Sequence, residues 1–191
     1  MKKYLIIAAA LWIASQHGAF AQAKLDTDDI VDSLRGLETQ AQISAPALYQ
    51  RALARIKAEP GMSAVGRPSV AEELSKLPQL TVEIQFNLNS DVIRPQSYKT
   101  LGRIADSLFH PYLLEYKFLV VGNTDATGKR EHNLQLSQRR ANAIRDALVT
   151  FGVSPARVAA VGLGEEQLQD KNNPTDPINR RVQLFAVGKV R

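Results

Sequence analysis

The chain has no cysteine and only three histidines in its 191 residues. Without cysteine it can form no disulfide, use no thiol chemistry and carry no lipid on an N-terminal cysteine. Only His110 and His132 lie beyond residue 23, and the sequence contains neither His-x-x-x-His nor Gly-x-Ser-x-Gly. Ser137 therefore has no obvious histidine base, and His132 is expected to be a solvated residue rather than a metal ligand. We expect a protein that is not an enzyme and holds no metal or cofactor.

Long hydrophobic runs are also missing, because the longest one covers only residues 5–14 and a membrane span needs about 20 apolar residues. Lys2 and Lys3 precede this run, and small-residue patterns of the Ala-x-Ala kind follow it at residues 19–23. The pattern predicts a cleaved secretory signal peptide over residues 1–23 and a periplasmic protein. Cleavage removes two lysines and lowers the formal net charge from +5 to +3. Such a mild basic excess suits an anionic polymer or membrane surface, and nucleic acid is not an expected partner.

The remaining chain divides into a short helical segment and one domain of ordinary size. Residues 26–37 and 46–59 have the spacing of amphipathic helices, and a Gly/Ser/Pro-containing stretch around residues 60–70 is typical of a linker. We therefore expect an accessory segment or spacer at residues 24–79 and a separate domain at residues 80–191.

The C-terminal domain alternates strands and helices. The expected elements are a strand at 80–86, a helix between Pro95 and Pro111, a strand at 117–122, a long helix at 133–151, and strands at 157–161 and 180–187. The order β-α-β-α-β-β predicts an α+β sandwich in which two helices cover one face of a mixed sheet. Right-handed crossovers would bring the loop at 86–90, the turn at 124–125 and the start of the long helix together.

Three polar residues interrupt the apolar stripe of the long helix. Asn133, Ser137 and Arg140 lie at i, i+4 and i+7, in the N-terminal half of the helix. Because an unpaired buried polar group costs about 1–3 kcal/mol, they need partners or a water-filled cleft. One interpretation is a structural network, for instance Arg140 pairing with Asp125. The other is a ligand pocket at the helix N-terminus, where free backbone amides favour an anion.

The same residues resemble the signature of the OmpA-like C-terminal domain, a peptidoglycan-associating module of the cell envelope. The resemblance covers about residues 80–187. The matching positions are Gly122, Thr124, Asp125, Gly128, Asn133, Leu136, Ser137, Arg140, Ala141, Gly162, Gly164, Glu165 and residues 179–182. Two positions depart from the signature: Asn123 replaces a frequent His, and Asn87 stands where an Asp often follows the first strand.

The resemblance implies noncovalent binding of the diaminopimelate residue in peptidoglycan stem peptides. Asp125 would receive the ligand ammonium, and Arg140 would bind a carboxylate with two parallel hydrogen bonds. The other residues implied to line the site are Thr124, Asn133, Leu136, Ser137, Asn87, Asn89, and either Arg180 or Arg181, since strand alternation does not decide which arginine faces the ligand.

Peptidoglycan is thus the expected partner, and the protein would tether itself or a complex to a Gram-negative-type wall, near the inner face of the outer membrane. One alternative is a subunit of a secretion, efflux or stator-like complex whose specificity lies in residues 24–79. A second is a hydrolase acting on the same polymer, which the scarcity of catalytic residues disfavours.

Overall fold

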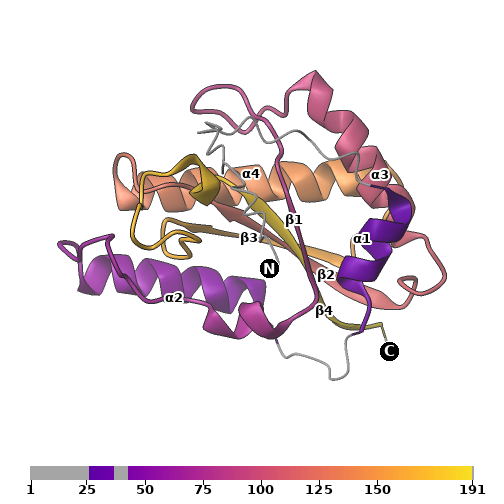
Figure 1. The fold of residues 1–191 in the computed structure, drawn as a ribbon, viewed down its shortest axis with the longest axis horizontal. Coiled ribbons are helices and arrows are strands. Elements are labelled where there is room, and N and C mark those ends of the chain that lie inside the picture. Colours follow the sequence, from indigo (N-terminus) through magenta and orange to yellow (C-terminus); the bar gives the residue numbers. More distant parts are fainter. Residues whose placement is uncertain (1–25, 37–42, 191) are drawn as a thin grey trace, which may run out of the picture.

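A computed structural model describes residues 26–36 and 43–190 (Figure 1). The predicted signal peptide lies outside the described residues. The helices are α1 (Thr27–Leu34), α2 (Ala45–Ala58), α3 (Tyr98–Leu108) and α4 (Arg130–Thr150), with short 3-10 turns η1 (Glu72–Lys76), η2 (Pro95–Ser97) and η3 (Pro177–Asn179). The strands are β1 (Gln79–Val82), β2 (Tyr116–Asn123), β3 (Val158–Gly164) and β4 (Val182–Lys189). Within the described residues, no helix is both long and apolar enough to cross a membrane.

The four strands form one mixed sheet in the order β1-β4-β2-β3. β4 pairs antiparallel with both β1 and β2, and β2 pairs parallel with β3. The predicted α+β class with a mixed sheet is confirmed. β1 is shorter than predicted and ends at Val82, although Ile84 and Phe86 continue the apolar alternation. Beyond Val82 the chain no longer pairs with β4, and instead Phe86 bridges to Ile93 and Arg94 N donates to Gln85 O at 2.8 Å.

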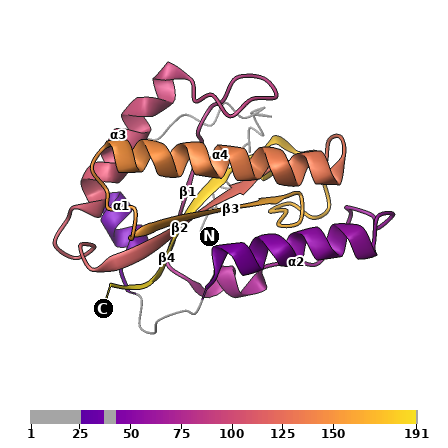
Figure 2. The same cartoon turned by 180° about the vertical axis from the view of Figure 1, so that it is seen from behind.

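Helices cover both faces of the sheet, whereas the sequence predicted two helices on one face (Figures 1 and 2). α1, α3 and α4 bury their apolar stripes against one face, in a cluster that includes Val120 and Leu184. α2 and η1 cover the other face, where Leu119, Val121 and Phe185 meet Leu48 and its neighbours on α2. The second layer comes from the segment that the sequence suggested was an accessory spacer.

Residues 60–70, predicted to be a linker, lie against the loop that follows β3. Gly66 N donates to Lys171 O at 2.8 Å, and Val70 N donates to Glu166 O at 3.1 Å. Arg67 is only 4% exposed. The backbone and one side chain of this stretch therefore contact the domain directly, which matters for the site described below.

Two glycines of β3 allow α4 to lie directly on the sheet. A Cβ atom at Gly162 would stand 2.0 Å from Gln138 N, and one at Gly164 would stand 2.8 Å from Leu134 N. Gly164 also has φ +54°, a conformation that suits glycine. Ser137 Oγ accepts a hydrogen bond from Gly164 N at 2.8 Å. This close approach places the N-terminal half of α4 beside the loops that follow β2 and β3.

Candidate functional site

Asp125 and Arg180 form an ion pair where β2 ends and β4 begins. Asp125 Oδ2 lies 2.6 Å from Arg180 Nη1, and Asp125 Oδ1 accepts a hydrogen bond from Thr127 N at 3.0 Å. The Asp125 side chain is 11% exposed and the Arg180 side chain is 50% exposed. The turn at residues 125–127 thus fixes a carboxylate whose cationic partner can move into solvent.

Arg140 approaches the same place from α4. Its Nε donates to Ser90 O at 2.9 Å, and its guanidinium lies 4.9 Å from the centre of the Phe86 ring. Burial lowers the pKa of Arg140 from its ordinary value, repulsion from Arg139 and Arg180 lowers it further, and attraction to Asp91 and Asp125 opposes both. The guanidinium stays charged at neutral pH.

Asp125 does not pair with Arg140, so the interpretation of these two residues as an internal ion pair is wrong. Among the described residues, the carboxylate of Asp125 pairs with Arg180, and Arg140 takes part in no ion pair. Their mutual attraction still shows in the pKa of Arg140. Two guanidinium groups therefore gather with the Asp125 carboxylate at one end of the sheet, where Asp91 also attracts Arg140.

The loop after β1 supplies Asn87 and Asn89, and both are exposed. Asn87 O accepts from Ser90 N at 3.1 Å, and Asn89 has φ 51°, so the chain turns tightly here. Asn89 Oδ1 lies 2.8 Å from His132 Nε2. His132 is exposed as expected, and its contact with Asn89 ties this loop to the start of α4.

The polar residues predicted to line the site from α4 are used internally. Asn133 is 4% exposed, and its Nδ2 donates to Asp125 O at 3.3 Å, Thr127 O at 3.2 Å and Glu165 Oε2 at 2.7 Å. Ser137 is 1% exposed, and its hydroxyl donates to Leu134 O while accepting from Gly164 N. These two side chains hold the loops around the site and do not face solvent.

Thr124 and Leu136 are also buried, at 4% and 7% exposed. Thr124 N donates to Gly164 O at 2.9 Å, which links the ends of β2 and β3, and its hydroxyl has no hydrogen-bond partner among the described residues. Leu136 belongs to neither of the two apolar clusters that cover the sheet.

The structure separates the two arginines that alternation could not distinguish. Arg180 contacts Asp125, whereas Arg181 is 8% exposed and donates from Nη2 to Gln167 O at 2.9 Å. Burial lowers the pKa of Arg181 to about 10. Asn179 is fully buried, and its side chain accepts from the backbone of the loop before it at 2.8 and 2.9 Å. Of Arg180 and Arg181, it is Arg180 that contacts Asp125.

A cavity of about 370 Å³ lies between the turn at 91–93 and α4. It is lined by Asp91, Val92, Ile93, Tyr98, Ala143, Asp146, Ala147, Thr150 and Phe151. Its edge at Asp91 follows Ser90, the residue whose carbonyl accepts from Arg140. The cavity therefore adjoins the charged cluster without containing Asp125, Arg140 or Arg180.

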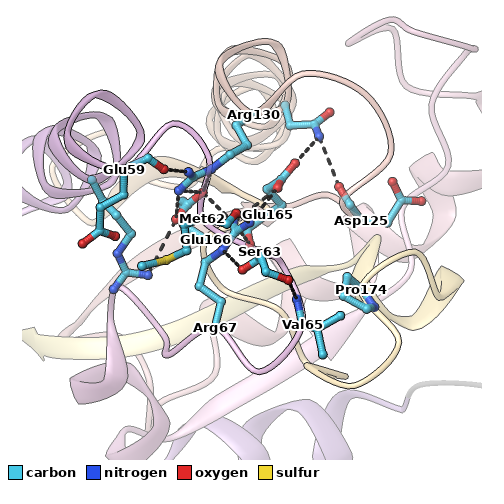
Figure 3. Close-up of polar contacts among 12 residues, drawn as sticks. Glu59, Met62, Ser63, Val65, Arg67, Asp125, Arg130, Glu165, Glu166 and Pro174 are labelled. Carbon is cyan, nitrogen blue, oxygen red and sulfur yellow. Dashed lines mark hydrogen bonds and ion pairs between the residues drawn. The ribbon is translucent and has the colours of Figure 1, made fainter.

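Sequence reasoning missed a buried ion-pair network behind the site (Figure 3). Glu166 has a fully buried side chain that contacts Arg67 at 2.9 Å, both ends of the Arg130 guanidinium at 2.9 and 3.0 Å, and Arg55 at 3.6 Å. Glu165 contacts Arg67 at 3.2 Å. The available signal was a pair of glutamates directly after an apolar strand, because buried carboxylates require cationic partners.

The protein is a small α+β domain in which Asp125, Arg180 and Arg140 gather at one end of the sheet. Residues 85–181 match the model described as the OmpA family. This match covers half of the chain, and the chain therefore belongs to the OmpA family.

Two curated relatives and one solved structure illustrate the similarity. The chain is 35% identical over 125 residues to outer membrane porin F of Pseudomonas aeruginosa, covering 64% of this chain and 34% of that protein. It is 36% identical over 101 residues to the peptidoglycan-associated lipoprotein of Pseudomonas putida, covering 52% and 59%. The crystal structure of the peptidoglycan-associated lipoprotein from Burkholderia pseudomallei aligns with a TM-score of 0.43 at 34% identity, covering 59% of this chain and 91% of that one. The chain thus spans only part of the curated relatives that it matches.

Proposed function

We propose that this protein binds peptidoglycan noncovalently through the diaminopimelate of its stem peptides and tethers itself or a complex to the wall. The observation that carries the proposal is that the Asp125 carboxylate contacts the half-exposed Arg180 and lies close enough to Arg140 to raise the pKa of its guanidinium. The free end of diaminopimelate carries an ammonium and a carboxylate on one carbon. Asp125 receives the ammonium, and the planar guanidinium of Arg140 binds the carboxylate.

Arg180 occupies the place that the ligand ammonium would take beside Asp125. Its side chain is half exposed, so it can move aside into solvent, whereas the Asp125 carboxylate is only 11% exposed and needs a cation in its place. Once displaced, Arg180 adds a second cation near the ligand carboxylate. The ligand therefore replaces one partly exposed ion pair with two.

The family supports the proposal, since relatives include proteins named peptidoglycan-associated lipoproteins. A single site of this kind gives weak binding to a free stem peptide, because exposed ion pairs contribute little. Several copies held in one assembly retain the polymer far more strongly. Catalysis has no support at Ser137, whose hydroxyl is buried and occupied by Leu134 O and Gly164 N.

A sacculus pull-down with residues 24–191 tests the proposal. The parent protein should be retained and released by free diaminopimelate but not by lysine, which lacks the second carboxylate. Asp125→Ala and Arg140→Ala should lose retention. Asp146→Ala is the matched control, since Asp146 pairs with Arg145 at 2.9 Å on the exposed surface of α4. Equal retention of all four proteins, each folded by circular dichroism, would contradict the pocket assignment.

The alternative role in an envelope complex stays a prediction that concerns residues 24–79. The structure changes how it should be tested, because deleting that segment uncovers the apolar face beneath α2. Gln50→Glu and Lys57→Glu alter exposed residues of α2 and leave its buried stripe intact. Loss of co-purification with one envelope complex, while sacculus binding persists, would favour the assembly role.

A further inference from the structure

Arg67 is a buried cation that lies outside the part of the chain matching the family model. Its own loop holds it, since Nε donates to Ser63 O and Nη2 donates to Met62 O, both at 3.2 Å. Its Nη1 lies 3.2 Å from Glu165 Oε1 and 2.9 Å from Glu166 Oε1. The guanidinium is therefore fixed on one side by residues 62–63 and on the other by two buried carboxylates.

Glu165 connects Arg67 to the residues around Asp125. One carboxylate oxygen contacts Arg67, and the other accepts from Asn133 Nδ2 at 2.7 Å (Figure 3). The same Asn133 nitrogen donates to the backbone oxygens of Asp125 and Thr127. Thr127 N in turn donates to the Asp125 carboxylate. A continuous series of polar contacts thus runs from residue 67 to the carboxylate at the surface.

We propose that Arg67 is a positioning residue for the ligand site, acting through Glu165 and Asn133 on the turn at 125–127. This inference rests on the proposed role of Asp125 in ligand binding. A side-chain amide can flip by exchanging its donor and acceptor ends, and the Glu165 carboxylate requires the donor end to face it. Without Arg67, Glu165 loses the cation closest to it and with it the fixed orientation that aligns Asn133.

Residues 43–77 consequently do more than separate the domain from a partner. α2 supplies an apolar cover for the sheet, and the loop before η1 supplies the cation that orients the site. Displacing that loop weakens ligand binding even when α4 and the strands keep their places. The coupling is reciprocal, so bound ligand stabilises the docked loop.

Arg67→Gln tests the proposal, and Arg55→Gln is its matched control. Arg55 also belongs to the network, at 3.6 Å from Glu166, but its other contacts are to the backbone oxygens of residues 68 and 69 and none is to Glu165. Amide exchange at Thr127 should rise about tenfold in Arg67→Gln relative to the parent and should stay unchanged in Arg55→Gln. Diaminopimelate binding should weaken by a similar factor in Arg67→Gln alone.

A double-mutant cycle distinguishes positioning from general destabilisation. In an Asn133→Ala background, Arg67→Gln should cause no further loss of binding, although it should still lower stability. An additive loss, or equal exchange at Thr127 in the Arg67 and Arg55 variants, would overturn the proposal. If Arg67→Gln does not fold, Arg67→Lys keeps the charge without the fork and is judged in the same way. If the parent shows no diaminopimelate binding, the proposed function fails, and exchange at Thr127 alone decides the positioning role.

Discussion

Glu166 carries a buried negative charge that three arginines share, and Glu166→Gln removes that charge with almost no change in shape. Its side chain is fully buried, and the Arg67 and Arg130 side chains facing it are 2% and 10% exposed. Removing one partner from a buried ion pair costs about 3–5 kcal/mol, because the other charge is left without compensation. Among the described residues, Glu165 would still pair with Arg67, but Arg130 and Arg55 would be left with no carboxylate partner. We expect the free energy of unfolding to fall by about 3–5 kcal/mol, a large part of the 5–15 kcal/mol typical of a domain.

Urea unfolding followed by far-UV circular dichroism measures this loss. Tryptophan fluorescence is unsuitable, because the only tryptophan, Trp12, lies in the predicted signal peptide. Glu73→Gln is the matched control, since Glu73 also pairs with an arginine of α2, Arg51, at 2.6 Å, but the two side chains are 39% and 51% exposed. The control should lose no more than about 1 kcal/mol.

Salt provides the second comparison. A loss caused by a buried charge should be nearly the same at low and high salt, whereas the exposed pair at Glu73 should be screened. Equal losses in the two variants would refute the reasoning. So would a loss at Glu166 that disappears in high salt, since either result would mean that water reaches the network.

Three further predictions concern other parts of the molecule. Gly162→Ala should lower stability by at least about 1–3 kcal/mol through overpacking against α4, while Gly102→Ala, where a Cβ meets nothing within 4 Å, should raise it by about 0.5–1 kcal/mol; urea unfolding measures both. Hydrogen bonds from Asn173 and Asn172 lower the pKa of Asp170 below 3.8, so the stabilisation that they give is present above pH 3.8 and is lost as pH falls through the lowered value. The NMR chemical shift of the Asn173 amide should follow this titration, and a midpoint above pH 3.8 would contradict the prediction. Arg180→Gln should lower the free energy of unfolding by about 1–3 kcal/mol, because it leaves the 11% exposed carboxylate of Asp125 without its cation, and no measurable change would mean that water already compensates that carboxylate.

The order of the elements could be predicted from the sequence because hydrophobic period is a local property. The end of β1 could not, since Ile84 and Phe86 continue the alternation although pairing with β4 ends at Val82, before the turn at residues 88–89. The turn is fixed by contacts with Ile93 and with Ser97, whose Oγ accepts from Gln85 N at 2.9 Å. Such contacts join residues about ten positions apart. They cannot be detected from the alternation of apolar and polar residues along a strand.

The second helical layer could have been predicted from the sequence of β2, although not from the hydrophobic period of α2 alone. Leu48, Ala52 and Ile56 predict a buried stripe but not the surface that it covers. The run Phe118–Val121 is apolar at every position, which is typical of a strand buried on both faces. A strand of this kind requires a cover on its second face, and the only amphipathic helices outside the C-terminal domain lie before residue 60.

The site was predictable in part for a similar reason. Polar residues on an apolar helix stripe indicate that partners exist, and Asn133 and Ser137 do have partners, but these are backbone groups of loops distant in sequence. Which arginine meets Asp125 depends on a short 3-10 turn before β4, which sets Arg180 outside the strand and Arg181 at its buried edge. The structure was needed to settle both points.

The ion-pair network is a costly way to attach residues 43–77, because apolar residues of similar volume stabilise a buried contact equally well. Apolar burial by α2 already supplies attachment on the second face of the sheet. The network additionally fixes the orientation of its side chains. A guanidinium, two carboxylates and an amide each form hydrogen bonds with preferred angles. We infer that the buried charges are kept for the alignment that they impose on Asn133, and through it on Asp125. Apolar attachment and alignment therefore depend on different residues of the same segment.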